Sequence, residues 1–356
     1  MASNYFAKGL KRSALTIALG MCFVGGVQAQ TNTGGNVVGS ATPGDTITIT
    51  SPSTGFSRTI TAGSDGNYRF AQLPSGQYQV SQNGGAPRTV NVNVGTSANV
   101  DFVGAGGDVT TLGNVVVTAN SGAVNPIDVS SVESTTILTA EQVAKIPVPR
   151  NITSVALLAP GTVRGAAAAG FGNLPSFGGS SVAENQFYVN GFNITNTFKN
   201  LAFAQVPFEG IAESQVKTGG YGAEFGRSTG GVINMITKRG TNEFKAGGSI
   251  YYIPESLSET APDLYYNNGL WISNNSKDNG WEATAAVWAG GALIKDKLFA
   301  YGLIQYGKTA SNTYTSRFLG NNLDSTSERP QWLAKVDWQI TDNHSVELTA
   351  FSDKRE

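Results

Sequence analysis

The last third of the chain repeats segments in which apolar and polar side chains alternate. The clearest segment is 331–341, where one face consists of Trp332, Ala334, Val336, Trp338 and Ile340 and the other is polar apart from Leu333. Alternation with a period of two predicts β-strands, and about ten residues is the length of a strand tilted across a bilayer. All five tryptophans lie beyond residue 241, which suits a membrane interface. A soluble β-sandwich with the same alternation remains an alternative.

Three further segments show the same alternation, and a fourth is ambiguous. The alternating segments are 244–252, 281–289 and 346–350, whereas 298–306 is apolar on both faces, so its direction is not predicted. Closed bacterial barrels need at least about eight strands, and an open sheet in lipid leaves edge groups unpaired at several kcal/mol each. We therefore expect residues 241–356 to be the start of an incomplete antiparallel transmembrane β-barrel. We also expect the chain to be a C-terminally truncated fragment.

Composition excludes several classes of protein. Charged residues make up 14% of the 356 residues and the formal net charge is −1, which argues against a nucleic-acid-binding protein. One cysteine, Cys22, and one histidine, His344, exclude a disulfide framework and a Cys/His zinc site within a single chain. No phosphate-binding G-x-x-x-x-G-K-[ST] motif occurs. We predict no metal and no cofactor.

The first 29 residues have the layout of a secretory signal peptide. Lys8, Lys11 and Arg12 precede an apolar stretch over 13–27, and a small-residue cleavage site ends at Ala29. The stretch is shorter than the roughly 20 residues that span a bilayer. We expect export from the cytoplasm, with an uncleaved N-terminal helix as the alternative.

Residues 30–104 predict a small β-sandwich. Short alternating runs are separated by turn residues, and Asp65-Gly66 between two such runs predicts a hairpin. The strings 65–70 and 73–78 resemble the carboxypeptidase-regulatory-like fold, an accessory module whose presence does not imply peptidase activity. A linker over 105–122 follows, with three consecutive valines that favour an extended backbone. Such a segment can pair with another protein's sheet edge, although a further strand of a neighbouring domain is the simpler interpretation.

Residues 123–240 predict a mixed α+β domain. Short helices are expected at 139–143, with a Thr139 cap, and at 152–158. Strands are expected at 186–192, turning at Asn-Gly, and at 230–238, and more weakly at 211–218.

Several of these motifs resemble TonB-dependent outer-membrane receptors of the Oar-like branch. Residues 115–118 resemble the TonB-box region, 149–161 the early plug, and 187–193 the plug's central strand. The most specific match is the block 216–227, which continues through 230–238 and in the family closes the plug. The resemblance implies a mainly β protein: the β-sandwich, a plug domain over 123–240, and the first barrel strands.

The resemblance also implies roles for particular residues. A TonB-box-like segment would pair with the periplasmic protein TonB and consists of Leu112, Val115, Val116, Val117 and Thr118. Glu224 and Arg227 would hold the plug to the barrel wall, although a purely structural role in the plug is equally open. Tight turns would explain the plug glycines Gly219, Gly220, Gly222, Gly226, Gly230 and Gly231.

The implied function is energy-coupled uptake of an unidentified substrate across the outer membrane, with outer-membrane lipid and TonB as partners. The loops 161–179 and 193–207 are candidate ligand contacts, but nothing in them names a ligand.

The sequence also bears on two other functions. The stretch 226–230 fits the nucleophile-elbow pattern G-x-S-x-G around Ser228, but a Gly-rich turn and a strand follow where a helix is required. His344 is the sole candidate base and lies in the expected barrel, so we predict no catalytic residue and no enzyme. A secreted or surface-exposed adhesion or binding protein built of β domains, without transport activity, is the remaining alternative.

Overall fold

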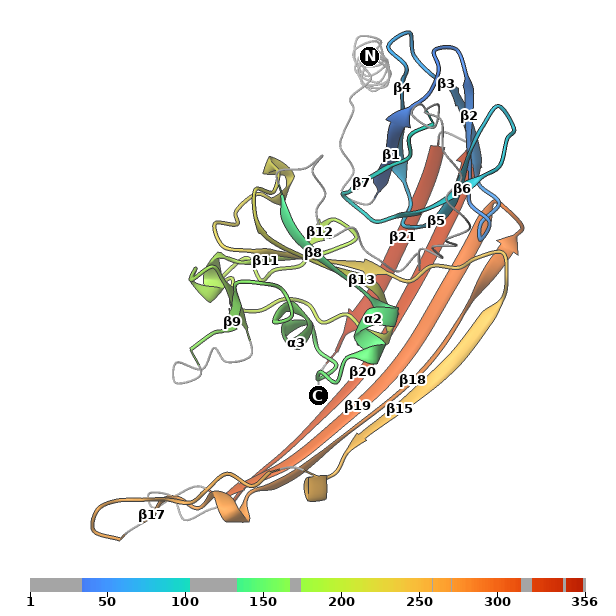
Figure 1. Ribbon diagram of the computed structural model, residues 1–356. Coiled ribbons are helices and arrows are strands. Elements are labelled where there is room, and N and C mark those ends of the chain that lie inside the picture. Colours follow the sequence, from blue (N-terminus) through green and yellow to red (C-terminus); the bar gives the residue numbers. More distant parts are fainter. Residues whose placement is uncertain are drawn as a thin grey trace, which may run out of the picture. The chain divides into compact units, whose positions relative to one another are not determined.

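A computed structural model describes residues 34–102, 133–166, 174–257, 259–269, 271–314, 322–341 and 344–354 (Figure 1). The predicted signal peptide and the TonB-box-like residues Leu112, Val115, Val116, Val117 and Thr118 lie outside the described residues.

The first described part is a sandwich of two β-sheets. One sheet has the order β4-β1-β7, formed by Asn67–Leu73, Gly35–Ser40 and Ser97–Asn99. The other has the order β3-β2-β5-β6, formed by Ser57–Thr61, Thr46–Thr50, Gly76–Gln82 and Arg88–Val92. Val37 and Phe70 of the first sheet share one buried cluster with Ile47 and Val80 of the second. Inward-facing residues of both sheets thus form the single core typical of a β-sandwich.

The Asp65-Gly66 turn does not close a hairpin, so that prediction was wrong. Strand β3, before the turn, pairs with β2, while β4, after it, pairs with β1 in the other sheet. Gly66 has the positive φ of 76° that the turn chemistry predicts. A tight turn can carry a chain between sheets as well as between paired strands, and local sequence does not distinguish the two.

The second part is a five-stranded sheet with short helices, the plug. Its order is β12-β11-β14-β13-β8, formed by Phe192–Asn193, Gln186–Val189, Val232–Thr237, Ile211–Gly219 and Ser134–Thr139. Helices α2 (Ala140–Lys145) and α3 (Ile152–Ala156) follow β8. The predicted Thr139 cap forms a full capping box with Gln142, which stabilises the start of α2. A small hairpin, β9 (Thr162–Arg164) and β10 (Pro175–Phe177), and the 3-10 helices η2 (Val182–Glu184), η3 (Phe208–Gly210) and η4 (Ala223–Phe225) complete it.

The third part is a sheet of long antiparallel strands, called here the long sheet. In chain order it consists of β15 (Lys245–Ile253), β18 (Asn279–Ile294), β19 (Leu298–Tyr314), β20 (Asn322–Thr341) and β21 (His344–Asp353). Each strand pairs with its neighbour in sequence, and β15 and β21 are the two edges, so the sheet is open (Figure 1). The connection from β15 to β18 contains η5 (Glu255–Leu257), the hairpin β16 (Leu264–Tyr265) and β17 (Trp271–Ser273), and η6 (Asn275–Lys277). The mainly β fold and the incomplete antiparallel barrel are confirmed.

The two faces of the long sheet differ in exposure as the alternation predicts. On β20, one face is buried and consists of Gln331, Leu333, Lys335 and Asp337. On the other face Trp332, Ala334, Trp338 and Ile340 are exposed and Val336 is half-buried. We call these the inner and the outer face. On β19 the side chains of Phe299, Tyr301, Leu303 and Gln305 are buried on the inner face, which settles the direction that the sequence left open. Among the described residues, helices are too short or too polar to cross a membrane.

Candidate functional site at the contact between plug and long sheet

An apolar contact joins the plug to the inner face of the long sheet. Tyr301, Leu303 and Leu333 belong to the same buried cluster as Ile211 and Val216 of plug strand β13. Gly210, at the end of η3, faces Leu333: a Cβ built on it would lie 3.5 Å from the Leu333 Cδ atoms. Leu333 is 1% exposed, so its apolar side chain, the exception in an otherwise polar face, is buried against the plug.

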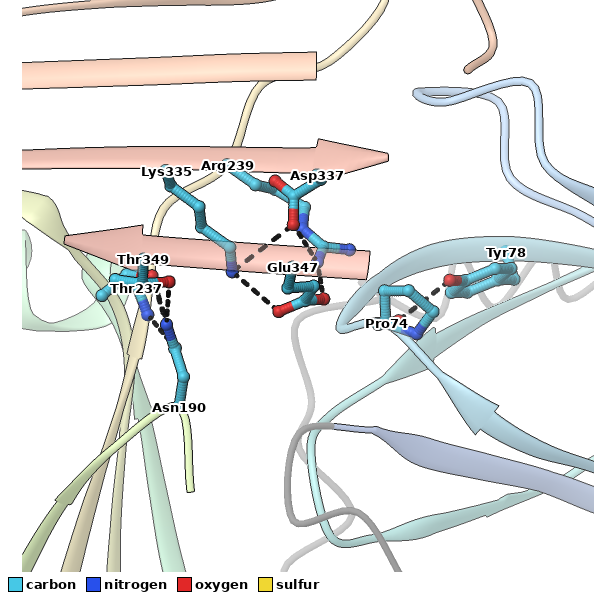
Figure 2. A network of polar contacts seen from close by, with 9 residues as sticks. All are labelled: Pro74, Tyr78, Asn190, Thr237, Arg239, Lys335, Asp337, Glu347 and Thr349. Carbon is cyan, nitrogen blue, oxygen red and sulfur yellow. Dashed lines mark hydrogen bonds and ion pairs between the residues drawn. The ribbon is translucent and has the colours of Figure 1, made fainter. Parts of the chain in front are cut away.

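A cluster of four charges lies beside this contact, as Figure 2 shows. Arg239, which follows plug strand β14, donates from Nη2 to Asp337 Oδ1 at 2.9 Å and also pairs with Glu347. Lys335 Nζ lies 3.2 Å from Glu347 Oε2 and 3.7 Å from Asp337 Oδ1. The Lys335 side chain is 2% exposed. Two cations and two anions balance, and each charge removed from water has an opposite charge beside it.

Asn190 links three strands through its side-chain amide (Figure 2). Its Nδ2 donates to Thr237 Oγ1 at the end of β14 and to Thr349 Oγ1 on β21, both at 2.9 Å. Its Oδ1 accepts from the Thr237 backbone N–H at 3.0 Å. Asn190 has a φ of 47°, which the predicted Asn-Gly turn between β11 and β12 allows. The turn therefore places the buried Asn190 amide within hydrogen-bond distance of β21 of the long sheet.

Arg150 forms a second polar contact, before helix α3. Its Nε donates to Glu209 Oε1 at 2.9 Å, and its guanidinium lies 5.0 Å from the Phe208 ring centroid and 4.3 Å from that of Tyr251 on β15. Lys238 lies nearby, with Nζ 5.7 Å from the Trp288 ring centroid of β18. Burial lowers the pKa of Lys238, and the neighbouring Glu209 carboxylate opposes that shift. Cation–π and ionic contacts of Arg150 and Lys238 thus join η3 to β15 and β18, the first two strands of the long sheet.

At its N-terminal edge the plug is held by contacts within its own sheet. Glu133 pairs with Lys217 of β13, and Lys217 Nζ lies 5.2 Å from the Phe225 ring centroid. Glu213, on the same strand, accepts from Gln215 Nε2 at 2.6 Å. Burial raises the pKa of Glu213 to about 7, although Gln215 and Lys217 oppose the shift.

The predicted wall contacts Glu224 and Arg227 are both exposed. They lie in and just after η4, and among the described residues neither takes part in an ion pair. Arg227 has a φ of 67°, as part of the turn that leads to β14. Their role as plug–barrel contacts stays a prediction.

The predicted turn glycines occupy different surroundings. Gly220 has a φ of 70°, which favours glycine. Gly230 and Gly231 are tightly packed instead: a Cβ would lie 2.4 Å from Asn185 Oδ1 and 2.4 Å from the Phe177 ring, respectively. Gly219 has open space around a built Cβ, a Cβ on Gly226 would lie 3.6 Å from the Ala223 carbonyl oxygen, and Gly222 faces the flexible Glu224 side chain.

Ser228 has a structural setting rather than that of a nucleophile. Its Oγ donates to the Glu184 and Gly231 carbonyl oxygens at 3.1 and 3.0 Å, and strand β14 follows where a nucleophile elbow requires a helix. His344 lies on β21, with Nδ1 2.9 Å from Thr341 Oγ1.

The residues that join plug and long sheet were not singled out from the sequence. Arg239, Asn190 and Arg150 carry the polar contacts. One signal was present: Lys335 and Asp337 point to the face opposite the tryptophans of a predicted membrane strand, and charges there call for partners.

The plug and residues 238–242, which follow it, thus contact the inner face of the open long sheet. Residues 128–232 match the family model of the TonB-dependent Receptor Plug Domain. The resemblance of the chain to TonB-dependent outer-membrane receptors is therefore confirmed.

The chain is also similar to a curated relative and to solved structures. The chain is 28% identical over 316 residues to the TonB-dependent transporter Oar of Myxococcus xanthus, which covers 82% of this chain and 28% of that protein. The siderophore receptor PirA of Pseudomonas aeruginosa is 21% identical, with a TM-score of 0.42 over 61% of this chain and 33% of that one. The outer membrane transporter YddB of Escherichia coli is 15% identical, with a TM-score of 0.49 over 60% of this chain and 32% of that one.

Proposed function

We propose that this chain is the N-terminal part of a TonB-dependent outer-membrane receptor that takes up an unidentified substrate in an energy-coupled manner. The proposed organisation is a signal peptide over 1–29, a carboxypeptidase-regulatory-like sandwich over 30–104 and a linker with a TonB-box-like segment over 105–122. The plug follows over 123–240 and the start of the barrel over 241–356.

The observation that carries the proposal is the sidedness of the long sheet. Its inner face is buried against a TonB-dependent receptor plug, whereas Ile250, Val287, Ile304 and Trp332 leave large apolar side chains exposed on the outer face. An exposed apolar band on one face and a globular plug on the other fit a wall between lipid and a plugged lumen. No observation on the described residues favours the adhesion protein.

A plugged barrel needs work to open, and the outer membrane holds no ATP. In the proposed mechanism TonB pairs edge-on with the extended segment around residues 112–119 and transmits force to the plug. Among the described residues, β8 is the first strand after that segment, so in this mechanism the force arrives at the edge of the plug sheet.

Cell fractionation and crosslinking test the proposal. We expect the chain in the outer-membrane fraction and crosslinked to TonB, and we expect Val116→Pro to abolish the crosslink because proline interrupts strand pairing. Ser121→Pro, in the same linker but outside the proposed segment, is the matched control and retains the crosslink. Recovery of the chain in the soluble periplasmic fraction would refute the function, whereas an unchanged crosslink in Val116→Pro would refute only the assignment of the segment.

A further inference from the structure

The connector from the plug to the long sheet, residues 238–242, contacts other elements at four of its five positions. At the first, the Lys238 backbone N–H donates to the Gly210 carbonyl oxygen at 2.8 Å, which ties the connector to η3. At the second, Arg239 joins Asp337 on β20 to Glu347 on β21. One guanidinium therefore spans two neighbouring wall strands, with Lys335 completing the charge balance.

The third position, Gly240, approaches the backbone of the wall itself. A Cβ at this position would lie 2.5 Å from the Ala300 carbonyl oxygen and 2.8 Å from that of Gly291. Both are backbone atoms of paired strands, so they cannot move aside without disturbing the sheet. Only glycine allows the connector to lie this close to β18 and β19.

The fifth position, Asn242, forms a two-way contact with the turn between β18 and β19. The Asp296 backbone N–H donates to Asn242 Oδ1 at 2.9 Å, and Asn242 Nδ2 donates to Asp296 Oδ1 at 2.7 Å. Asp296 has a φ of 63° in that turn. The connector therefore contacts β20 and β21 through Arg239, the backbone of β18 and β19 at Gly240, and the turn between β18 and β19 through Asn242.

The opposite end of the plug is held in another way. Strand β8 is the edge strand of the plug sheet, and it and the preceding Glu133 form polar contacts with β13 and, through Thr139, with α2 of the plug. They include the Glu133–Lys217 ion pair and a hydrogen bond of 3.0 Å from Thr218 Oγ1 to Ser134 Oγ. An edge strand leaves a sheet by breaking one ladder, whereas β14 lies between β11 and β13 and ends in the connector.

We propose that residues 238–242 are a fixed anchor that holds β14 on the inner face of the long sheet while β8 and α2 yield. The anchoring half of this proposal stands on the contacts alone. The yielding half rests on the proposed coupling to TonB.

Hydrogen exchange followed by mass spectrometry tests both halves on the full chain, purified in detergent from outer membranes. We expect Arg239→Ala to speed exchange in 232–242 by about ten-fold or more, because two charge-assisted contacts are lost. Arg239→Lys, which can satisfy one carboxylate, gives an intermediate rate. Lys245→Ala is the matched control: it removes an ion pair to Glu243 between exposed side chains and leaves exchange unchanged.

A second arm adds the purified periplasmic domain of TonB. We expect faster exchange over 134–145 and no change over 232–242. Unchanged exchange over 232–242 in folded Arg239→Ala would overturn the anchor. So would an increase in exchange over 232–242 on TonB addition as large as the increase over 134–145. If Arg239→Ala does not fold, Asn242→Ala replaces it with the same criterion over 238–242. TonB binding is measured separately by co-purification: its absence refutes the proposed function, whereas the Arg239 arm still decides the anchor.

Discussion

The two faces of the long sheet follow one alternating pattern but have different chemistry. On the outer face of segments 298–306 and 330–340 the large side chains are apolar, as for Ile304 at 66% exposure. The inner face mixes Leu303 and Leu333 with Gln331, Lys335 and Asp337, all buried. Side chains that contact lipid need only be apolar. Side chains that contact a protein surface must be complementary to it at each position. The inner face is therefore the one that specifies a particular plug.

Substitutions of two neighbouring residues of β20 give the strongest test of this difference between the faces. Leu333→Ala opens a cavity against Gly210 and is expected to lower the free energy of unfolding by about 2–5 kcal/mol. Trp332→Ala, one residue away on the outer face, removes a larger side chain that makes no such buried contact, and we expect a smaller loss. Urea unfolding in detergent micelles, followed by circular dichroism, measures both. Equal losses would show that the two faces are not distinct.

The outer face is tested by a charge. Ile304→Arg places a cation among apolar outer-face residues, and a midplane arginine costs a barrel roughly 2–4 kcal/mol. We expect a smaller share of the chain in the outer-membrane fraction at equal expression. Val163→Arg is the control, because Val163 is similarly exposed but lies on β9 of the plug. If both variants fractionate alike, the outer face does not meet lipid.

The same two faces explain how much of the fold the sequence predicts. The alternation at 331–341 predicts both faces of β20, including the inward side chain of Leu333 that breaks the polar pattern. The segment 298–306 defeats the method because its inner residues Phe299, Tyr301 and Leu303 are buried, the last two against an apolar plug surface, so both faces are apolar. Alternation in a sequence reveals only differences in polarity. It therefore cannot identify the inner face of a strand when both faces contact apolar surroundings.

The site is harder to predict than the fold. Glu224 and Arg227 lie in the most recognisable motif, which predicts a contact with the barrel, yet both are exposed in the structure. Arg239 lies 12 residues beyond Arg227, next to the last plug strand, and its partners Asp337 and Glu347 are about a hundred residues away. Sequence spacing cannot bring such residues together; only the register of β20 against β21 does so.

The smallest expected effect concerns an ion pair on the outer face. Lys308 Nζ lies 2.8 Å from Glu328 Oε1 across β19 and β20, two residues beyond Tyr306, where the apolar outer face ends. Both side chains are more than one third exposed, so water and salt screen their attraction. Glu328→Gln is therefore expected to leave the urea midpoint unchanged within error at low salt, and at 1 M salt, where the Debye length is about 3 Å.

Glu347→Gln makes the same chemical change on the inner face, where Arg239 and Lys335 would lose their shared carboxylate. The two cations would then share only Asp337, so one positive charge beside the buried Lys335 is no longer balanced. Salt screens a buried charge poorly, so the midpoint falls at both salt concentrations. An equal response of the two glutamates, or a loss in Glu347→Gln that salt removes, would mean that the inner cluster is solvated. In that case the charges on the inner face would no longer distinguish it from the outer one.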